Sequence, residues 1–494
     1  MGRYFVLILF IISISIGFLF LLENSSFINN KIFSFINPFN PIKPSISNTT
    51  KINSNSEYWK DPRGLFPIFA YNIPSNSSNL AASLRIIEKG GINIIINGNY
   101  GWMPDPIELK EAFLKLKNSN LKWLAIIENE CKDDFIFNNW NDKRNNNISK
   151  YLDFFNEDFV YGWYIWDEPG KNRQWCSPFN LVPNDDFEDI NNMVKQIRGN
   201  LKFRSKLDFI NLFPTYWDGT PDKEAYEKYV DAFFASQEFQ PRVLCFDHYP
   251  FLKPESGGFR NDYYLNLEII RNKSLQYNVP FWMIVLSSGH NDYINPSFEE
   301  IRFQVFSALA YGAKGLGYYL YSKSFEQIGY RSWILENYVD NESVNDSLYG
   351  PLYLPVKNLN VQIQNLGAFL IDYKSVKVIH TTDFPNFQKH INIGFPDSLK
   401  KTFLIDSILY KGKNSQADLL IGFFEKGNNS NEKVLLIVNK NFKENIKVDL
   451  KFKKNSSVRK LDKNSGKIEK VDTDNFCYIN LEGGEGDLFL LSNN

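Results

Sequence analysis

Eight short apolar runs, spaced along residues 64–321, constrain the fold of this chain more than any other feature. Each run is rich in β-branched or aromatic residues, which is typical of strands that are covered on both faces. In chain order the runs are GLFPIFAY (64–71), GINIIING (91–98), LKWLAIIE (121–128), YGWYIW (161–166), LDFINLFP (207–214), RVLCFD (242–247), PFWMIVLS (280–287) and AKGLGYYLY (313–321).

Helical patterns lie between several of these runs. Segment 78–91 begins with a Ser/Asn cap and ends at glycine, and segment 105–120 has a cap Asp followed by Pro. Segment 297–315 follows the same plan, with acids in its first turn where they favour the helix dipole. Eight strands that alternate with helices over about 250 residues predict an α/β fold, the (β/α)8 TIM barrel. A doubly wound open sheet is the rival, but no GxGxxG or phosphate-binding loop follows any run.

The pattern changes after the eighth run. A helix expected at 354–370 places five apolar residues at helical spacing, so it should pack onto the barrel; they are Val356, Leu359, Ile363, Leu366 and Leu370. Beyond residue 373 the chain turns to short alternating segments with frequent Asn, Lys and Gly, at 419–425, 434–442, 446–453 and 486–492. We therefore expect a barrel domain at 59–372, followed by a small all-β sandwich domain at 373–494.

The N-terminus predicts a targeting segment. Residues 4–22 are nearly all apolar and follow Arg3, which is long enough for a signal peptide or a membrane anchor. No small-x-small cleavage site follows, so residues 1–22 are either a cleaved signal or a single-pass anchor. Residues 23–58 are rich in Asn, Ser and Pro without a period, which predicts a disordered linker.

Several sequence features agree with passage through a secretory lumen. Glycosylation sequons occur at Asn76, Asn147, Asn272 and Asn341, although an Asn-rich chain also produces such sequons by chance. We expect a secreted or membrane-anchored protein whose globular part is extracellular or lumenal. The four cysteines show no CxxC spacing, so a zinc knuckle is not indicated. The sequence does not decide whether Cys131 and Cys176 form a disulfide. Cys245 should be buried in its apolar run.

Charge and histidine spacing narrow the function. The formal net charge is −1, which gives no reason to expect nucleic acid as a partner. No HxH or HExxH spacing occurs, so the sequence predicts neither a metal site nor another cofactor. Aromatic residues make up 16% of the chain, which fits either a large core or stacking platforms for sugars.

Acidic residues end two of the predicted strands. Asp167 and Glu168 close the fourth, in YGWYIWDEPG, and Asp247 closes the sixth. The carboxyl ends of barrel strands are where enzymes of this fold place their chemistry. Candidate substrate-binding residues near the same ends are Asn99, Trp102, Glu128, Tyr216, Trp217, His248, Tyr249, His290 and Tyr321. Carboxylates among aromatic rings suit carbohydrate, because sugar faces stack on rings and two acids can cleave a glycosidic bond.

The segment GWYIWDEPG resembles the strand-four signature of the clan A barrel glycoside hydrolases, in which Asn-Glu-Pro or a variant carries the acid/base glutamate. FDHYPF (246–251) and segment 299–321 are similar to segments of uncharacterised secreted glycosidase-like proteins. The same is true of VKNLNVQIQNLGAFL followed by a β-domain with LLIVNKN and GEGDLFLL. This resemblance covers roughly residues 60–494. It implies a barrel hydrolase in which Glu168 is the general acid/base.

The chain departs from that family at the end of the seventh run. The family places its nucleophilic glutamate there, whereas this chain has VLSSGH (285–290). Glu299 and Glu300 come later, in the expected first turn of the next helix. Three readings of the second acid follow. Asp247 acts as base or nucleophile opposite Glu168, or Asp167 orients a substrate N-acetyl group, since β-hexosaminidases resemble this chain in having adjacent Asp-Glu. In the third reading, no second acid exists.

The sequence thus predicts a glycoside hydrolase acting on a polysaccharide or glycan, with Glu168 as general acid/base and Asp247 as its leading partner. The main alternative is a non-catalytic glycan-binding barrel at the cell surface, and a structural surface protein is a further one. If these acids are structural rather than catalytic, Glu168 forms a salt bridge inside the barrel rim and Asp247 is a buried acid of that rim. The β-domain is expected to support the barrel rather than perform chemistry.

Overall fold

The computed structural model describes most of one compact unit, residues 58–494. The described residues are 58–71, 80–96, 106–116, 118–126, 157–170, 185–216, 221–323, 333–336, 346–382, 396–411, 418–427, 431–454, 456–471 and 476–493. The predicted targeting segment, the linker except for Tyr58, and the Cys131–Cys176 pair lie outside them. So do three of the sequons named above, Asn76, Asn147 and Asn341, whereas Asn272 is exposed on a helix. None of the described helices has the length and apolar character needed to cross a membrane.

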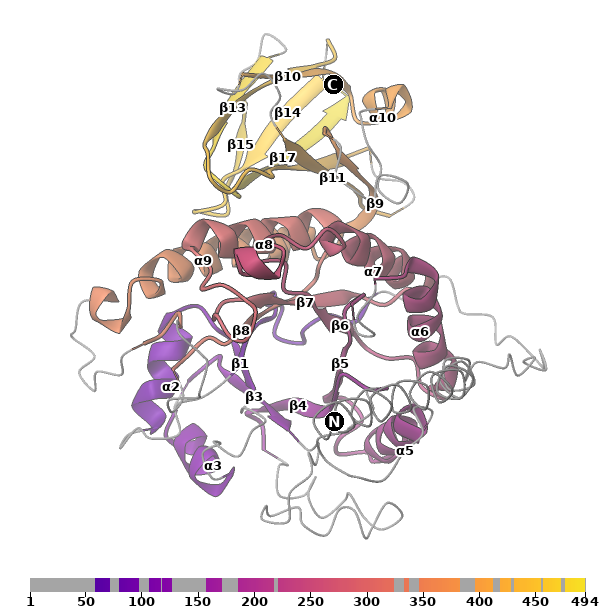
Figure 1. Ribbon diagram of the computed structural model, residues 1–494, viewed down its shortest axis with the longest axis vertical. Coiled ribbons are helices and arrows are strands. Elements are labelled where there is room, and N and C mark those ends of the chain that lie inside the picture. The colour runs from indigo at the N-terminus through magenta and orange to yellow at the C-terminus, as the bar shows by residue number, and fades with distance from the viewer. Residues whose placement is uncertain are drawn as a thin grey trace, which may run out of the picture. The chain divides into compact units, whose positions relative to one another are not determined.

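Eight parallel strands close into a barrel in chain order, which confirms the predicted fold class (Figure 1). They are β1 (Ile68–Tyr71), β2 (Ile94–Ile96), β3 (Lys122–Ile126), β4 (Val160–Asp167), β5 (Leu207–Leu212), β6 (Leu244–Asp247), β7 (Phe281–Leu286) and β8 (Leu316–Tyr319). Each lies within or overlaps one of the eight apolar runs. The runs are continuously apolar because the barrel interior covers one face and the helices cover the other.

Large aromatic rings fill the inside of the barrel. The ring centroids of Phe69 and Trp282 lie 5.6 Å apart, and Phe209 lies 5.8 Å from Phe69. Glycine in β8 makes room for them, since a Cβ at Gly317 would lie 2.1 Å from the Phe69 ring. The barrel is therefore a packed core rather than a pore, and chemistry is left to its ends.

Helices surround the barrel (Figure 1). They are α2 (Leu80–Lys89), α3 (Pro106–Lys115), α5 (Asp185–Gly199), α6 (Lys223–Ser236), α7 (Tyr263–Tyr277), α8 (Phe298–Tyr311) and α9 (Tyr353–Leu370), with short 3-10 turns at Pro254–Ser256 and Asp346–Tyr349. The five apolar residues singled out in α9 are all at most 1% exposed, as the sequence predicts. Helix α7 is different, because it is buried nearly all around, including Asn266, Glu268 and Arg271.

The C-terminal part forms two antiparallel sheets, as expected for a β-sandwich. One has the order β10-β13-β16 and the other β15-β14-β17-β12-β11-β9. Their strands are β9 (Lys374–His380), β10 (Ile405–Lys411), β11 (Leu419–Glu425), β12 (Lys433–Asn439), β13 (Ile446–Phe452), β14 (Ser456–Leu461), β15 (Ile468–Lys470), β16 (Phe476–Leu481) and β17 (Gly486–Asn493), with helix α10 at Asp397–Thr402. A second apolar core lies between these sheets.

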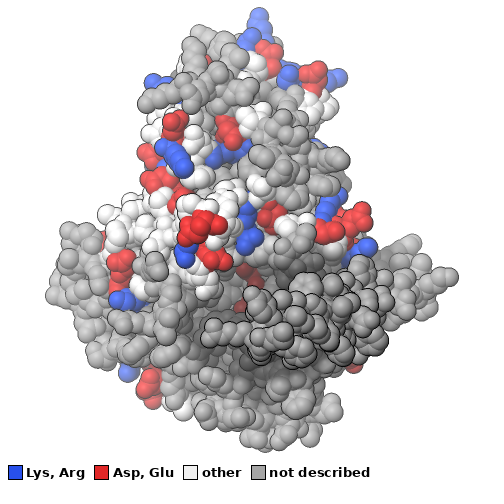
Figure 2. Space-filling model, in the orientation of Figure 1, with Lys and Arg blue, Asp and Glu red and all other residues white. Residues whose placement is uncertain are grey.

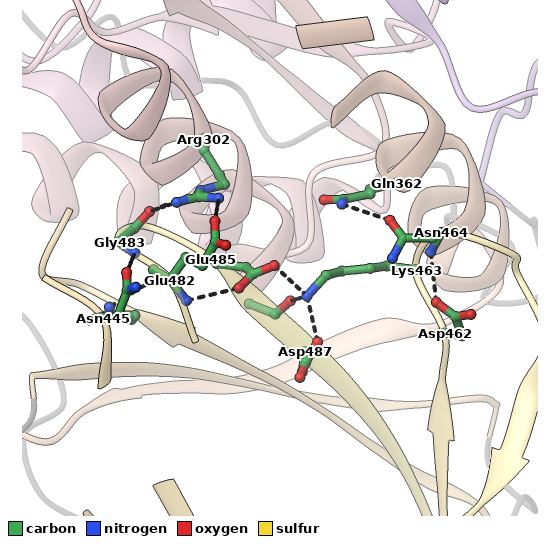
Figure 3. Close-up of polar contacts among 12 residues, drawn as sticks. Arg302, Gln362, Asn445, Asp462, Lys463, Asn464, Glu482, Gly483, Glu485 and Asp487 are labelled. Carbon is green, nitrogen blue, oxygen red and sulfur yellow. Dashed lines mark hydrogen bonds and ion pairs between the residues drawn. The ribbon is translucent and has the colours of Figure 1, made fainter. Parts of the chain in front are cut away.

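The larger sheet packs against helix α8. Gly422 of β11 permits this, since a Cβ there would lie 2.2 Å from the Ala310 carbonyl oxygen. Polar contacts extend the same interface (Figure 3): the Arg302 guanidinium donates to the Gly483 carbonyl at 2.6 and 2.9 Å and pairs with Glu482. On the face drawn in Figure 2, positive and negative side chains are interspersed over the β-domain.

Candidate active site

Two aspartates are joined by one amide nitrogen at the carboxyl ends of β4, β5 and β6. Asn211 Nδ2 donates to Asp167 Oδ1 at 3.0 Å and to Asp247 Oδ1 at 2.8 Å. Strand register explains the meeting, because Asp167 pairs with Asn211 and Asn211 pairs with Cys245, two residues before Asp247. Residues two apart on a strand share a face, so all three polar side chains point into the barrel mouth. Asp247 is 5% exposed and Asn211 is 3% exposed.

Two tyrosine hydroxyls extend the hydrogen bonds of this cluster. Tyr164 donates its hydroxyl to Asp167 Oδ1 at 2.6 Å, and Tyr71 donates to the Tyr164 hydroxyl at 2.8 Å. Burial, followed by the charge of Asp167, raises the pKa of Tyr71 well above its usual range. Its hydroxyl therefore stays protonated and remains a donor at any working pH. Asp167 thus receives two neutral donors on one oxygen, which favours its charged form.

Glu168 occupies an unusual backbone position. Its φ is +48°, in the left-handed region that residues other than Gly and Asn rarely adopt. The Glu168 N–H donates to the Asn211 carbonyl at 2.8 Å, and the next carbonyl, of Pro169, accepts from the Tyr229 hydroxyl at 2.8 Å. Strand β4 therefore ends at Asp167, and the in–out alternation stops there. Glu168 is half-buried at the rim, and its charge adds to the burial-driven rise in the Tyr229 pKa.

Asp247, the last residue of β6, and His248, which follows it, face opposite ways. Asp247 faces the mouth, whereas His248 is fully buried and its Nε2 lies 3.2 Å from Asp262 Oδ2. Thr215 also donates to Asp262 Oδ2, at 2.6 Å. Burial lowers the pKa of His248, while the histidine contact and the Thr215 hydrogen bond bring the pKa of Asp262 to about 2 despite burial. This placement favours a structural role for His248 over the predicted substrate contact.

Aromatic rings form one wall of the mouth. Tyr249 lies 5.6 Å from Tyr319, 5.4 Å from Tyr293 and 5.9 Å from His290, measured between ring centroids. Tyr216 joins them, because its hydroxyl accepts a 3.3 Å hydrogen bond from Tyr293. Burial raises the pKa of Tyr216 and Tyr249 well above the usual range and lowers that of His290. The wall is therefore neutral, and it brings together three of the predicted substrate-binding residues.

Tyr321 lies away from this wall. It is fully buried, and a Cβ built at Gly90 would lie 2.2 Å from its hydroxyl oxygen, so its ring points outward to the end of α2. Only its backbone contributes near the mouth, where its N–H donates to the Tyr71 carbonyl at 3.2 Å. Asn99, Trp102, Glu128 and Trp217 lie outside the described residues.

Strand β7 ends without a carboxylate. Ser287 and Ser288 follow it, and the N–H groups of both donate to the Tyr319 carbonyl. The first acid beyond is the exposed Asp292 in the loop before α8. Glu299 and Glu300 follow in the first turn of α8, where Glu300 forms a capping box with Ser297. The prediction that Glu299 and Glu300 stand in the first turn of this helix is therefore confirmed. Among the residues that the structure describes, no group of three or more His, Cys, Asp or Glu side chains could hold a metal ion.

Asn211 was not identified as a site residue from the sequence, although the sequence contains an indication of its role. It stands inside the apolar run LDFINLFP at a position whose side chain, by alternation from Phe209, faces the interior. A polar residue at an inward position near the end of a barrel strand is costly unless it is hydrogen-bonded. That reasoning would have placed it beside Asp167.

Known proteins resemble this chain in fold rather than in sequence. No protein-family model matches it, and no curated protein matches it significantly. A β-galactosidase from Bacillus circulans sp. alkalophilus superposes with a TM-score of 0.50 at 10% identity, over 86% of this chain and 99% of that one. An endoxylanase from Clostridium papyrosolvens C71 has a TM-score of 0.38 at 12% identity, over 89% and 97% of the two chains.

A family 51 α-L-arabinofuranosidase from Bifidobacterium longum has a TM-score of 0.44 at 8% identity, over 88% and 98%. These neighbours are glycoside hydrolases with (β/α)8 barrels. Identities this low are informative about fold alone. The chain therefore has the (β/α)8-barrel fold of glycoside hydrolases, followed by an antiparallel β-domain.

Proposed function

We propose that this chain is a glycoside hydrolase that cleaves O-glycosyl bonds of a polysaccharide or glycan at the carboxyl end of its barrel. The observation that carries the proposal is the meeting of Asp167 and Asp247 on Asn211, beside the left-handed Glu168. Three acids from two strands, next to a neutral aromatic wall, supply what glycosidic cleavage needs: a proton donor, an anionic partner and a stacking surface.

The hydrogen bonds divide the acids by role. Asp167 receives donors from Tyr164 and Asn211, which favour its charged form, so it is a poor proton donor and a good stabiliser of positive charge on the sugar. Glu168 is the general acid/base. Asp247 serves as the nucleophile or base opposite Glu168. The reading in which Asp167 orients a substrate N-acetyl group remains open.

The two aspartates are too close to form an inverting pair. Their Oδ1 atoms lie 3.0 and 2.8 Å from the same nitrogen, so their separation cannot exceed the sum of those distances. Inverting enzymes hold their carboxyl groups about 6.5–9.5 Å apart, to leave room for a water molecule. The bound admits the separation of about 5–5.5 Å that retaining enzymes use, so distance alone does not choose between Asp167 and Glu168. The two neutral donors to Asp167 favour Glu168 as the acid that works with Asp247.

A non-catalytic glycan-binding barrel is the second candidate. The observation that favours it is the end of β7, where Ser287 and Ser288 stand at the position of the resembled family's nucleophile. Binding without hydrolysis would need the aromatic wall but not the acids. The two candidates predict different results when an acid is removed. A hydrolase loses turnover, whereas a glycan-binding barrel has no turnover to lose and keeps its affinity.

The substitution Glu168→Gln tests the proposal. It keeps the shape of the side chain but cannot deliver a proton, so kcat/KM should fall by about 10²–10⁴-fold with little change in Tm. The variant Glu255→Gln is the matched control, because Glu255 is an exposed acid in the loop after β6. A structural role for Glu168 predicts the reverse, a clear loss of Tm with activity lost only through unfolding.

We also propose that residues 1–22 direct the protein to the secretory route, as a cleaved signal or a single-pass anchor. The support is the apolar stretch 4–22 after Arg3. Expression with and without residues 1–22, followed by fractionation of cells and medium, tests this. The full chain should appear in the membrane or the medium, and equal amounts of both forms in the soluble cell fraction would refute it.

A further inference from the structure

An arginine that forms no ion pair with any described acid lies at the mouth of the barrel. Arg260 stands in the loop between β6 and α7, and its Cζ lies 3.7 Å from the centroid of the Tyr216 ring. Its Cζ also lies 5.8 Å from the centroid of the Tyr293 ring. No acid in the described part of the chain forms an ion pair with it. Arg198 and Arg242 contrast with it, since both bind the buried Asp208 at the other end of β5.

The Arg260 guanidinium is also incompletely satisfied. Its Nε is buried and has no hydrogen-bond partner in the structure. Buried donors are almost always paired, and charged donors most of all, so this Nε is suited to bind an acceptor that the described residues do not supply. The nearby Asp262 does not supply it, because no hydrogen bond or ion pair joins its carboxylate to Arg260; its Oδ2 accepts from Thr215 and lies 3.2 Å from His248 Nε2.

Arg260 and the acid cluster face the same aromatic wall. Burial is the main cause of the raised pKa of Tyr216, the charge of Asp247 adds to the rise, and Arg260 opposes it. The same opposition acts on Tyr293. The Tyr216–Tyr293 pair is therefore near one positive and one negative group. A sugar bound on this wall would lie close to both the acids and the guanidinium.

We infer that Arg260 binds an anionic group of the substrate, so that the site takes glycans bearing a carboxylate or a sulfate. The guanidinium fork matches both groups with two parallel hydrogen bonds, and Nε is one of the donors that such a pair uses. Stacking on Tyr216 holds the fork in one orientation before the ligand arrives. This inference rests on the proposed carbohydrate site and names the class of sugar that the site prefers.

Equilibrium binding to matched glycans tests the inference without requiring hydrolysis. The probes are xylo-oligosaccharides with and without a glucuronate branch, galacto-oligosaccharides beside oligogalacturonates, and a sulfated galactan. The wild-type protein should bind at least one charged probe about tenfold or more tightly than its neutral counterpart. Added salt should weaken that preference, because it rests on charge. The uronate and sulfate probes show which anion fits.

Variants separate recognition from folding. Arg260→Gln should lose the preference for charged probes while binding neutral probes as before, and Arg260→Lys should keep part of it. Arg204→Gln is the control, since Arg204 is exposed in the turn that leads into β5, at the opposite end of the barrel. Each variant should keep its Tm within a few degrees of the wild type.

The outcomes distinguish this inference from the proposed hydrolase activity. A charge preference that Arg260→Gln abolishes, in a protein that cuts no probe, supports the inference while the hydrolase proposal fails. Hydrolysis of neutral glycans that is equal in wild type and Arg260→Gln supports the hydrolase and overturns the inference. Equal affinity for charged and neutral probes, or no binding of any charged probe, also overturns it.

Discussion

The barrel mouth and the interface with the β-domain use charge in opposite ways. At the interface, cations meet acids: Arg302 pairs with Glu482, and Lys463 lies 2.8 Å from Glu485 and 2.7 Å from Asp487 (Figure 3). At the mouth, two neutral groups, the Asn211 amide and the Tyr164 hydroxyl, donate hydrogen bonds to the aspartates. Charged groups that stabilise the fold form ion pairs within the chain. Charged groups that are positioned by neutral donors remain able to attract a charged or polar ligand.

The backbone shows the same contrast. Close approach at the interface is made with glycine, as at Gly422 and Gly484, where a Cβ would collide with helix α8. At the mouth, Glu168 takes a left-handed conformation although a side chain is costly there. Asn118, Asn278 and Asn291 share that conformation, which asparagine tolerates, and Leu404 of the β-domain shares it as well. The conformation of Glu168 is notable for its place, since it ends the alternation of β4 at the barrel mouth.

The largest stability effect should come from the interface. Phe303 is 1% exposed on α8 and packs between Phe251 of the barrel and Phe442 of the β-domain, at 5.9 and 5.4 Å between centroids. Phe303→Ala should lower the free energy of unfolding by about 3–5 kcal/mol, because it leaves a cavity. Denaturant unfolding measures this. Turnover per folded molecule should not change, and a selective loss of turnover would break the division between the two regions.

Removing Asn211 should have a smaller and different effect. Asn211→Ala takes the shared donor from Asp167 and Asp247, so the two like charges repel more and lose their fixed geometry. We expect kcat/KM to fall by about 10–100-fold, with the acidic limb of the pH–rate profile moved to higher pH. Tyr164→Phe removes one donor from Asp167 alone and should act in the same direction, but less. An unmoved pH limb would show that Asn211 is purely structural.

The smallest effect should be a loss of stability in mild acid. Burial lowers the pKa of His248, His290 and His380 in the folded protein. The unfolded chain takes up these protons near pH ~6.5, before the folded chain does, so stability should fall as pH drops below that value. Asp262, with a pKa of about 2, acts only in a lower window, where its stabilisation is lost as pH falls below ~3.9.

Thermal unfolding between pH 7.5 and 5 measures this effect. The variant His380→Gln should show a shallower decline than the wild type, because one buried imidazole no longer needs to be kept neutral. A flat profile in the wild type would show that these histidines do not control acid stability.

The barrel strands were predictable because local and tertiary requirements agree in them. Each strand is covered on both faces, so each appears in the sequence as an unbroken apolar run. Helix α7 was not recognised, because neighbouring elements bury it all around, and Glu268 and Arg271 pair with each other inside the protein. Its residues therefore show no polar face in the sequence.

The candidate site was predictable only in part. Strand ends placed Asp167, Glu168 and Asp247 at the mouth, but which way a neighbouring side chain points depends on where the strand stops. Alternation from an inward Asp247 already turns His248 outward to α7. On β8 the same rule would keep Tyr321 on the inward face of Gly317 and Tyr319, but the strand ends at Tyr319 and Tyr321 turns away from the mouth. The role of Arg260 depends on a loop that packs its guanidinium on Tyr216, which no periodicity encodes.

The most direct measurement of the central claim is hydrolysis of a glycan panel by the wild type and Glu168→Gln side by side, with binding of the same glycans recorded. The account predicts that the wild type releases new reducing ends from at least one glycan. Glu168→Gln should bind that glycan with similar affinity and cut it about 10²–10⁴-fold more slowly. A wild type that binds glycans but cuts none, or a stable Glu168→Gln variant that cuts equally well, would contradict the account.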